Sequence, residues 1–174
     1  MDFLKFLVAL GADVNAKDGI GLTPLHEAAR NNSIEVLQYL ISQGADVHAK
    51  NTSGDTLLHD AAFGNSNVNV LQYLISQGVN VNVRNVFGNT PLHEAAGKYN
   101  PNVEVLKFLL SQGAKVLAKN DDGKTPLDIA DTEEKKRILR EATAIHRKRQ
   151  SEIKRESVRQ REIRIGQKHF VWEV

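Results

Sequence analysis

The sequence predicts an all-α solenoid made of repeated helix pairs and hairpin loops, followed by a long C-terminal helix. Three observations support this prediction. A block reading TPLHEAA at residues 23–29 returns three times with small changes, at steps of 33, 34 and 35 residues. A second block, LQYLISQG at residues 37–44, recurs unchanged at residues 71–78. Finally, residues 133–165 contain neither proline nor glycine, which favours one continuous helix.

The first helix of each repeat has a clear start. A threonine, which is a favoured N-cap residue, opens each copy, and proline follows it in three of the four copies, at the first helical position where proline is well tolerated. The four threonines are Thr23, Thr56, Thr90 and Thr125. We therefore expect a short helix directly after each of them.

A second helix and a hairpin loop complete the repeat. Ile34, Leu37 and Ile41 have the spacing of an apolar helix face. A glycine suited to a left-handed C-terminal cap ends this helix, at Gly44 in the first full copy. From each capping glycine to the next threonine there are always 12 residues, so the length variation falls between the two helices.

These blocks resemble the ankyrin repeat, which has a T-P-L-H helix start and a G-A-D-V-N-A stretch after its second helix. The resemblance covers residues 1–142 and implies a half repeat at residues 1–17. Full repeats then start near residues 18, 51, 85 and 120. Residues 143–174 form a separate basic helical extension in this interpretation.

The two ends of the stack differ. The first unit lacks one helix, which would leave Phe3 and Phe6 partly uncovered. Either the chain is a fragment of a longer protein or the half repeat is an imperfect cap, and the sequence leaves both open. At the other end Ile138 and Leu139 keep an apolar stripe, while Lys136 replaces the outer apolar residue of earlier repeats, as a polar cap requires.

Composition and charge narrow the function classes. The chain has no cysteine, which excludes disulfides and thiolate metal sites. Without a signal-peptide pattern or an apolar run of about 18 residues, we expect a cytoplasmic protein. Nuclear import is the alternative, because Lys135-Lys136 and residues 147–149 match a bipartite pattern. Residues 1–132 carry a net charge of −4 and residues 133–174 a net charge of +6.

Three histidines in register, His26, His59 and His93, invite a metal-site interpretation. Helices pack about 8–10 Å apart, whereas zinc needs its nitrogen ligands at about 2 Å, so one ion cannot contact two of these side chains. The resemblance implies that each histidine instead braces a hairpin through hydrogen bonds. We therefore expect neither a metal nor a cofactor.

Glu27, Asp60 and Glu94 form a second row, and the same spacing argues against a catalytic carboxylate pair. The row is either a solvated acidic stripe or part of a partner-binding surface. Lys124-Thr125 is typical of the end of a phosphate-binding loop, but the upstream glycine that this pattern needs is Ala118. With no catalytic triad or dinucleotide fingerprint either, we predict that the protein is not an enzyme.

The resemblance implies that partners bind a concave surface formed by hairpin tips and inner helices. An exposed aromatic at a hairpin tip, Phe87 beside Val86, is a candidate anchor, unless it folds back on a neighbouring hairpin. The predicted partner-binding residues are Ile20, Leu22, Arg30, Thr52, Asp55, Phe63, Val86, Phe87, Asn89, Lys98, Asp122 and Lys124. The predicted function is a protein-interaction module or scaffold.

The basic extension supports an alternative function. Its cations could bind nucleic acid or an anionic membrane through phosphate groups, namely Arg147, Lys148, Arg149, Lys154 and Arg155. A solvated helix held by local ion pairs is the plainer interpretation. In a third interpretation, the apolar end at residues 170–172 docks on the concave surface or on a second copy of the chain.

Overall fold

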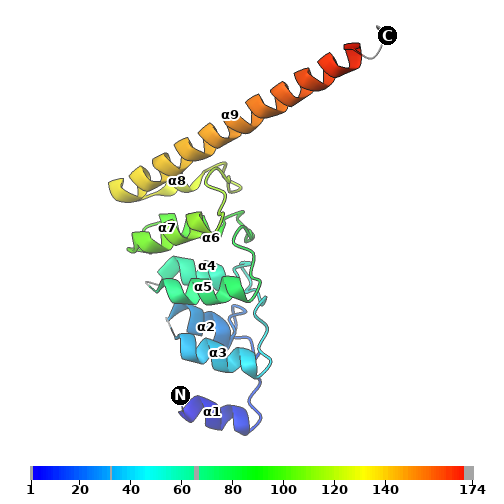
Figure 1. The fold of residues 1–174 in the computed structure, drawn as a ribbon. Helices are drawn as coiled ribbons and strands as arrows, with labels where there is room; N and C mark the ends of the chain where they lie inside the picture. The colour runs from blue at the N-terminus through cyan, green and yellow to red at the C-terminus, as the bar shows by residue number, and fades with distance from the viewer. Residues whose placement is uncertain (1, 32, 65–66, 171–174) are drawn as a thin grey trace.

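Helices lie across the molecule in a stack, with hairpin loops along one side (Figure 1). The computed structural model describes residues 2–31, 33–64 and 67–170, with side chains up to residue 164. These residues form helices and no strand. The helices are α1 (Asp2–Ala9), α2 (Pro24–Arg30), α3 (Ile34–Ser42), α4 (Leu57–Gly64), α5 (Val68–Ser76), α6 (Pro91–Ala96), α7 (Val103–Ser111), α8 (Pro126–Ile129) and α9 (Glu133–Phe170). The predicted all-α solenoid with a long C-terminal helix is confirmed.

The inner helices α2, α4, α6 and α8 follow the four threonines and pack on one another in succession. The N-caps of α2, α6 and α8 have extended backbone, as at Thr23 with φ −98° and ψ 165°. Paired alanines, such as Ala61 and Ala62 with no exposed surface, keep the inner row slim, so that these helices approach closely. Leucines from both helices of each repeat fill the space between the rows, and Leu58 and Leu71 are fully buried.

Backbone hydrogen bonds join successive hairpin tips. The Thr52 N–H donates to the Ile20 carbonyl, the Val86 N–H to the Ser53 carbonyl, and the Asp121 N–H to the Phe87 carbonyl, each at 3.0 Å. Gly21 shows why the turn needs glycine: its φ is +80°, and a Cβ there would lie 2.9 Å from the backbone nitrogen of Thr52. The tips therefore form a continuous ledge beside the inner helices.

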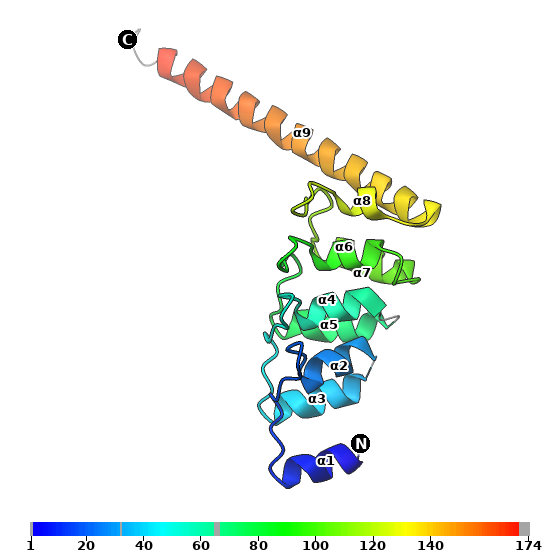
Figure 2. The ribbon, with the colours of Figure 1, turned by 180° about the vertical axis from the view of Figure 1, so that it is seen from behind.

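The ends of the stack agree with the expected asymmetry. Helix α1 has no buried residue, and Phe3 and Phe6 are 73% and 57% exposed. At the other end Ile138 and Leu139 are buried against the last repeat. Helix α9 then continues away from the stack without a break (Figures 1 and 2). The predicted boundary at residues 142 and 143 thus falls inside one helix and stays a prediction.

Lys135 has an unexpected role at this end. Its side chain is only 1% exposed, and its Nζ donates to the Gly97 carbonyl at 2.6 Å and to Asp131 Oδ1 at 2.8 Å. This overturns its place in a bipartite import pattern, because a buried ammonium is not available to a receptor. Among the helices of the described residues, none is long and apolar enough to cross a membrane.

Candidate functional site

A hollow of about 320 Å³ lies where α2, α4 and α6 meet the hairpin tips. We call it the central hollow, and the surface that carries it, made of inner helices and tips, the inner face. This face corresponds to the concave surface expected from the sequence. The central hollow is lined by Arg30, Asp55, His59, Asp60, Phe63, Asn85, Phe87, Asn89 and Glu94. Five of these nine residues were predicted as partner-binding residues: Arg30, Asp55, Phe63, Phe87 and Asn89.

The three repeat histidines hold the hairpins that border the central hollow. The backbone N–H of Thr56 donates to His59 Nδ1 at 3.2 Å, so Nδ1 is the acceptor and the proton lies on Nε2. This Nε2–H donates to the Asn89 carbonyl of the next repeat at 3.0 Å. His93 reaches the Lys124 carbonyl in the same way at 3.1 Å, and His26 the Asp55 carbonyl at 3.4 Å. Burial lowers the pKa of all three, which keeps the rings neutral.

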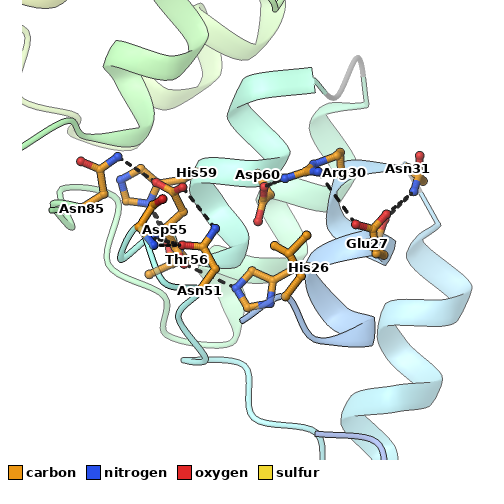
Figure 3. Close-up of polar contacts among 12 residues, drawn as sticks. His26, Glu27, Arg30, Asn31, Asn51, Asp55, Thr56, His59, Asp60 and Asn85 are labelled. Atoms are coloured by element: carbon orange, nitrogen blue, oxygen red, sulfur yellow. Dashed lines mark hydrogen bonds and ion pairs between the residues drawn. The ribbon is translucent and has the colours of Figure 1, made fainter. Parts of the chain in front are cut away.

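A row of asparagines shapes the tips from within. Asn51 Oδ1 accepts from the backbone N–H groups of Ser53 and Asp55, both at 2.9 Å. Asp55 in turn accepts from Asn51 at 3.2 Å and from Asn85 of the next hairpin at 2.8 Å (Figure 3). The Asp55 carboxylate is therefore fixed between two tips at the edge of the central hollow.

Arg30 and Asp60 form an ion pair across two repeats, with Nη2 2.5 Å from Oδ1. The Asp60 side chain is only 5% exposed, and the Arg30 side chain is 39% exposed. Burial raises the pKa of Asp60, and the hydrogen bond and charge of Arg30 oppose this rise without cancelling it. The interpretation of the carboxylate row as a solvated stripe is therefore wrong at Asp60, which lies in the floor of the central hollow.

Glu94 occupies the next place in that row and is half-buried. Its Oε1 accepts from Asn89 Nδ2 at 3.2 Å. Burial raises its pKa from 4.5 to about 7, and the nearby charge of Asp55 adds to this effect. Glu27, the first member of the row, remains exposed and lies near Arg30. Three equivalent positions thus have three different environments.

Aromatic side chains line the rim of the central hollow. Phe87 is 60% exposed and Val86 59% exposed, so the alternative in which Phe87 folds back and is covered is wrong. Phe63 is half-buried, and its ring centroid lies 4.8 Å from that of Tyr99, which is 59% exposed. The Nζ of Lys98 lies 4.8 Å from the same Tyr99 ring. The inner face therefore carries apolar surface next to buried charge.

The other predicted partner-binding residues lie outside the central hollow. Ile20, 58% exposed, and Thr52 lie at adjacent tips, where the Thr52 hydroxyl donates to the Ile20 carbonyl at 2.9 Å. Asp122 and Lys124 are exposed at the last tip. Leu22 is only 7% exposed, so it offers little surface to a partner, although it lines a shallow hollow beside the first hairpin.

The cations in the outer part of α9 are in solvent. Residues 144–164 are all exposed, and among the described side chains none of Arg147, Lys148, Arg149, Lys154 and Arg155 forms an ion pair. The local ion pairs lie nearer the stack, as at Lys136–Glu133 and Arg137–Glu141. The predicted docking of residues 170–172 falls outside the part of the chain with described side chains.

Sequence reasoning missed two features of the central hollow. It passed over Asn85, although an Asx residue stands three positions before the turn glycine in every copy, at Asp18, Asn51, Asn85 and Asn120. That regularity was readable and signals a side chain that caps the turn. It also missed the Arg30–Asp60 pair, because nothing in a linear sequence shows which side chains meet across a repeat boundary.

The comparison with known families agrees with this architecture. A family model for ankyrin repeats, three copies in length, matches residues 1–85 and again residues 58–141. No curated protein matches the chain. The two matches together span the helices α1 to α8 and the start of α9. The chain therefore belongs to the ankyrin-repeat family.

Proposed function

We propose that this protein is a non-catalytic interaction module that binds a protein partner on its inner face, centred on the central hollow. Ankyrin repeats are generally protein–protein interaction modules, and the family is typically non-catalytic. The observation that carries the proposal is Phe87, which lines the central hollow, is exposed beside the equally exposed Val86, and lies on hydrogen-bonded tips. A rigid, exposed aromatic beside a pocket has the character of a binding hot spot.

The backbone around Phe87 supports this role. The Phe87 N–H donates to Asn85 Oδ1 at 3.0 Å, and its carbonyl accepts from Asp121 at the next tip. Since the backbone is held on both sides, the ring is presented with little loss of backbone freedom on binding. A partner would therefore gain contact area at Phe87 without ordering a loose loop.

A capture experiment tests this proposal. Proteins cross-linked to the intact chain are compared with those cross-linked to Phe87→Ala and to Phe3→Ala, which removes an exposed phenylalanine outside the central hollow. We expect one partner to be lost with Phe87→Ala and kept with Phe3→Ala. Equal recovery with both variants would refute binding at the inner face.

A second candidate function rests on α9. Its exposed, unpaired cations at residues 147–155 suit an anionic surface, and nucleic acid or an anionic membrane would be held through phosphates. Binding of this kind falls steeply as salt rises, whereas a partly apolar contact at the inner face weakens only modestly. A chain lacking residues 147–174, tested with nuclease and at two salt concentrations, separates the two candidates.

A further inference from the structure

The central hollow carries more negative than positive charge. Its lining holds the carboxylates of Asp55, Asp60 and Glu94 but only one cation, Arg30. Arg30 is paired with Asp60, and among the described residues neither Asp55 nor Glu94 forms an ion pair. Partly burying carboxylates without cations is unfavourable, so the charge of the central hollow favours a positively charged group.

The repeat register shows where a cation is missing. Arg30, at the end of α2, pairs with Asp60 in the next repeat. The position equivalent to Arg30 in the following repeat is Phe63, and the position equivalent to Asp60 is Glu94. Glu94 therefore lacks the arginine that its counterpart has, and an aromatic ring stands in its place. The raised pKa of Glu94 is the expected result of a half-buried carboxylate beside Asp55 without a cation.

A second observation comes from the floor of the central hollow. Asp60 Oδ2 is buried and has no hydrogen-bond partner, although the Asp60 side chain is only 5% exposed. Figure 3 shows this carboxylate between Arg30 and His26. The Nε of the neighbouring Arg30 is also buried without a partner, so the ion pair in the floor of the central hollow is incompletely hydrogen-bonded and its negative charge is only partly compensated.

The shape and the rim limit what this donor can be. About 320 Å³ is at the small end of ligand pockets and suits one side chain. Phe63 and Phe87 offer ring surface to methylene groups and to a cation. The described residues contain no group of His, Cys, Asp and Glu that could hold a metal ion, and a phosphate would be repelled by the carboxylates. A long side chain with an apolar stem and a positively charged head matches both the aromatic rings and the carboxylates.

We propose that the central hollow receives the lysine or arginine side chain of a protein partner, with its charged head at Glu94 and Asp55, above the buried Asp60, and its stem against Phe63 and Phe87. This inference rests on the proposed binding function and states the chemistry of the partner's anchor. The inserted cation takes the place that an arginine at position 63 would fill. The chain's own α9 leaves the far end of the stack, so its cations could reach this site only from a second copy (Figure 1).

Small probes test the proposal on the full chain. N-acetyl-arginine N-methylamide and N-acetyl-lysine N-methylamide are titrated against the labelled protein and followed by NMR. N-acetyl-citrulline N-methylamide, which has the shape of the arginine probe without its charge, is the control. We expect a charged probe to bind at least about tenfold more tightly than the citrulline probe, with shifts at residues 55–63 and 85–94. Equal binding of charged and neutral probes would overturn the proposal.

Three variants locate the site. Glu94→Gln keeps the shape of the side chain and removes its charge, and Phe63→Arg supplies the missing cation from within the chain. Both should abolish the difference between the charged and neutral probes. Glu35→Gln, on the exposed part of outer helix α3, should leave binding unchanged. If the charged probe bound Glu94→Gln as well as the parent chain, the assignment would fail.

Two further outcomes separate the proposals. If the full chain self-associates in sedimentation experiments and Glu94→Gln does not, the central hollow binds α9 of a second copy. The proposal of a different protein as partner would then be overturned. If no charged probe binds but a captured partner is still lost with Phe87→Ala, the proposed function stands and the proposal of a lysine or arginine anchor is overturned.

Discussion

Replacing Glu94 by glutamine should stabilise the folded protein above neutral pH. The pKa of Glu94 rises from 4.5 to about 7 on folding because of burial, so the folded state holds this proton more tightly than the unfolded chain. The stability linked to the proton is fully present below pH 4.5 and is lost as the pH rises through about 7. Glutamine does not titrate, and its carbonyl oxygen can still accept from Asn89.

The magnitude follows from the size of the pKa change. A move from 4.5 to about 7 corresponds to about 3 kcal/mol of unfavourable ionisation in the folded state. Because Glu94 keeps some contact with solvent, we expect Glu94→Gln to recover about 1–2 kcal/mol at pH 8. Near pH 4.5, where the carboxyl is protonated in the folded protein, the difference should approach zero.

Urea unfolding followed by circular dichroism between pH 5 and pH 8 measures this difference. Glu27→Gln is the matched control, because Glu27 stands at the equivalent place of the first repeat and is exposed. We expect the stability difference between Glu94→Gln and the parent chain to grow with pH, and that of Glu27→Gln to stay flat. A constant difference for Glu94→Gln across this range would refute the argument that a half-buried carboxylate without an ion-pair partner causes it.

The structure makes three further predictions, each measured by urea unfolding. His59→Ala should lower the free energy of unfolding by about 3 kcal/mol at pH 8, because it removes a buried ring and its hydrogen bonds to two repeats. The loss should be smaller at pH 5, because burial lowers the pKa of His59 and the stability contributed by the neutral ring declines as the pH falls. Lys135→Ala should cost about 2 kcal/mol, since it leaves a carbonyl without its donor, whereas Lys136→Ala should change stability by less than about 0.5 kcal/mol. Gly21→Ala should cost about 2 kcal/mol because of its positive φ and close backbone contact, and Gly19→Ala, with no neighbour within 4 Å, about 0.5 kcal/mol or less. Equal effects within either matched pair would contradict the corresponding argument.

The sequence predicted the repeat architecture well because the signals for it are local. A threonine cap and a left-handed glycine act within a few residues, so the helix starts at Thr23 and Thr90 could be read without knowing the fold. The histidine brace was expected only through the resemblance, and its partner carbonyls lie about 30 residues away in the chain. Local physics therefore fixes the repeat, while contacts between repeats depend on the stacking.

The candidate site was predicted only in part for the same reason. Phe87 stands out because an aromatic residue beside Val86 is unusual at a hairpin tip, and it proved exposed. Leu22 proved almost fully covered, whereas the residues that follow the turn glycine in the other repeats are polar, so its burial could not be read from the repeat pattern. Lysine is rarely buried, so the burial of Lys135 could not be read from the sequence, and only the stacked structure shows the Gly97 carbonyl that holds it.

The departures from the repeat, rather than the repeat itself, define the central hollow. Glu27, Asp60 and Glu94 are equivalent in sequence, and a perfectly repeated chain would give each the same neighbours. Arg30 changes to Phe63 at the next equivalent position, so one carboxylate is paired and the following one is not. The change from arginine to phenylalanine at position 63 has a local effect. It places an aromatic ring beside Glu94, which has no ion-pair partner among the described residues. Restoring the repeat with Phe63→Arg should therefore stabilise the chain above pH 7 by lowering the pKa of Glu94, and at the same time close the hollow to a partner's cation. A variant that gained stability yet still bound the charged probe would show that the pairing of Glu94 and the binding site are unrelated.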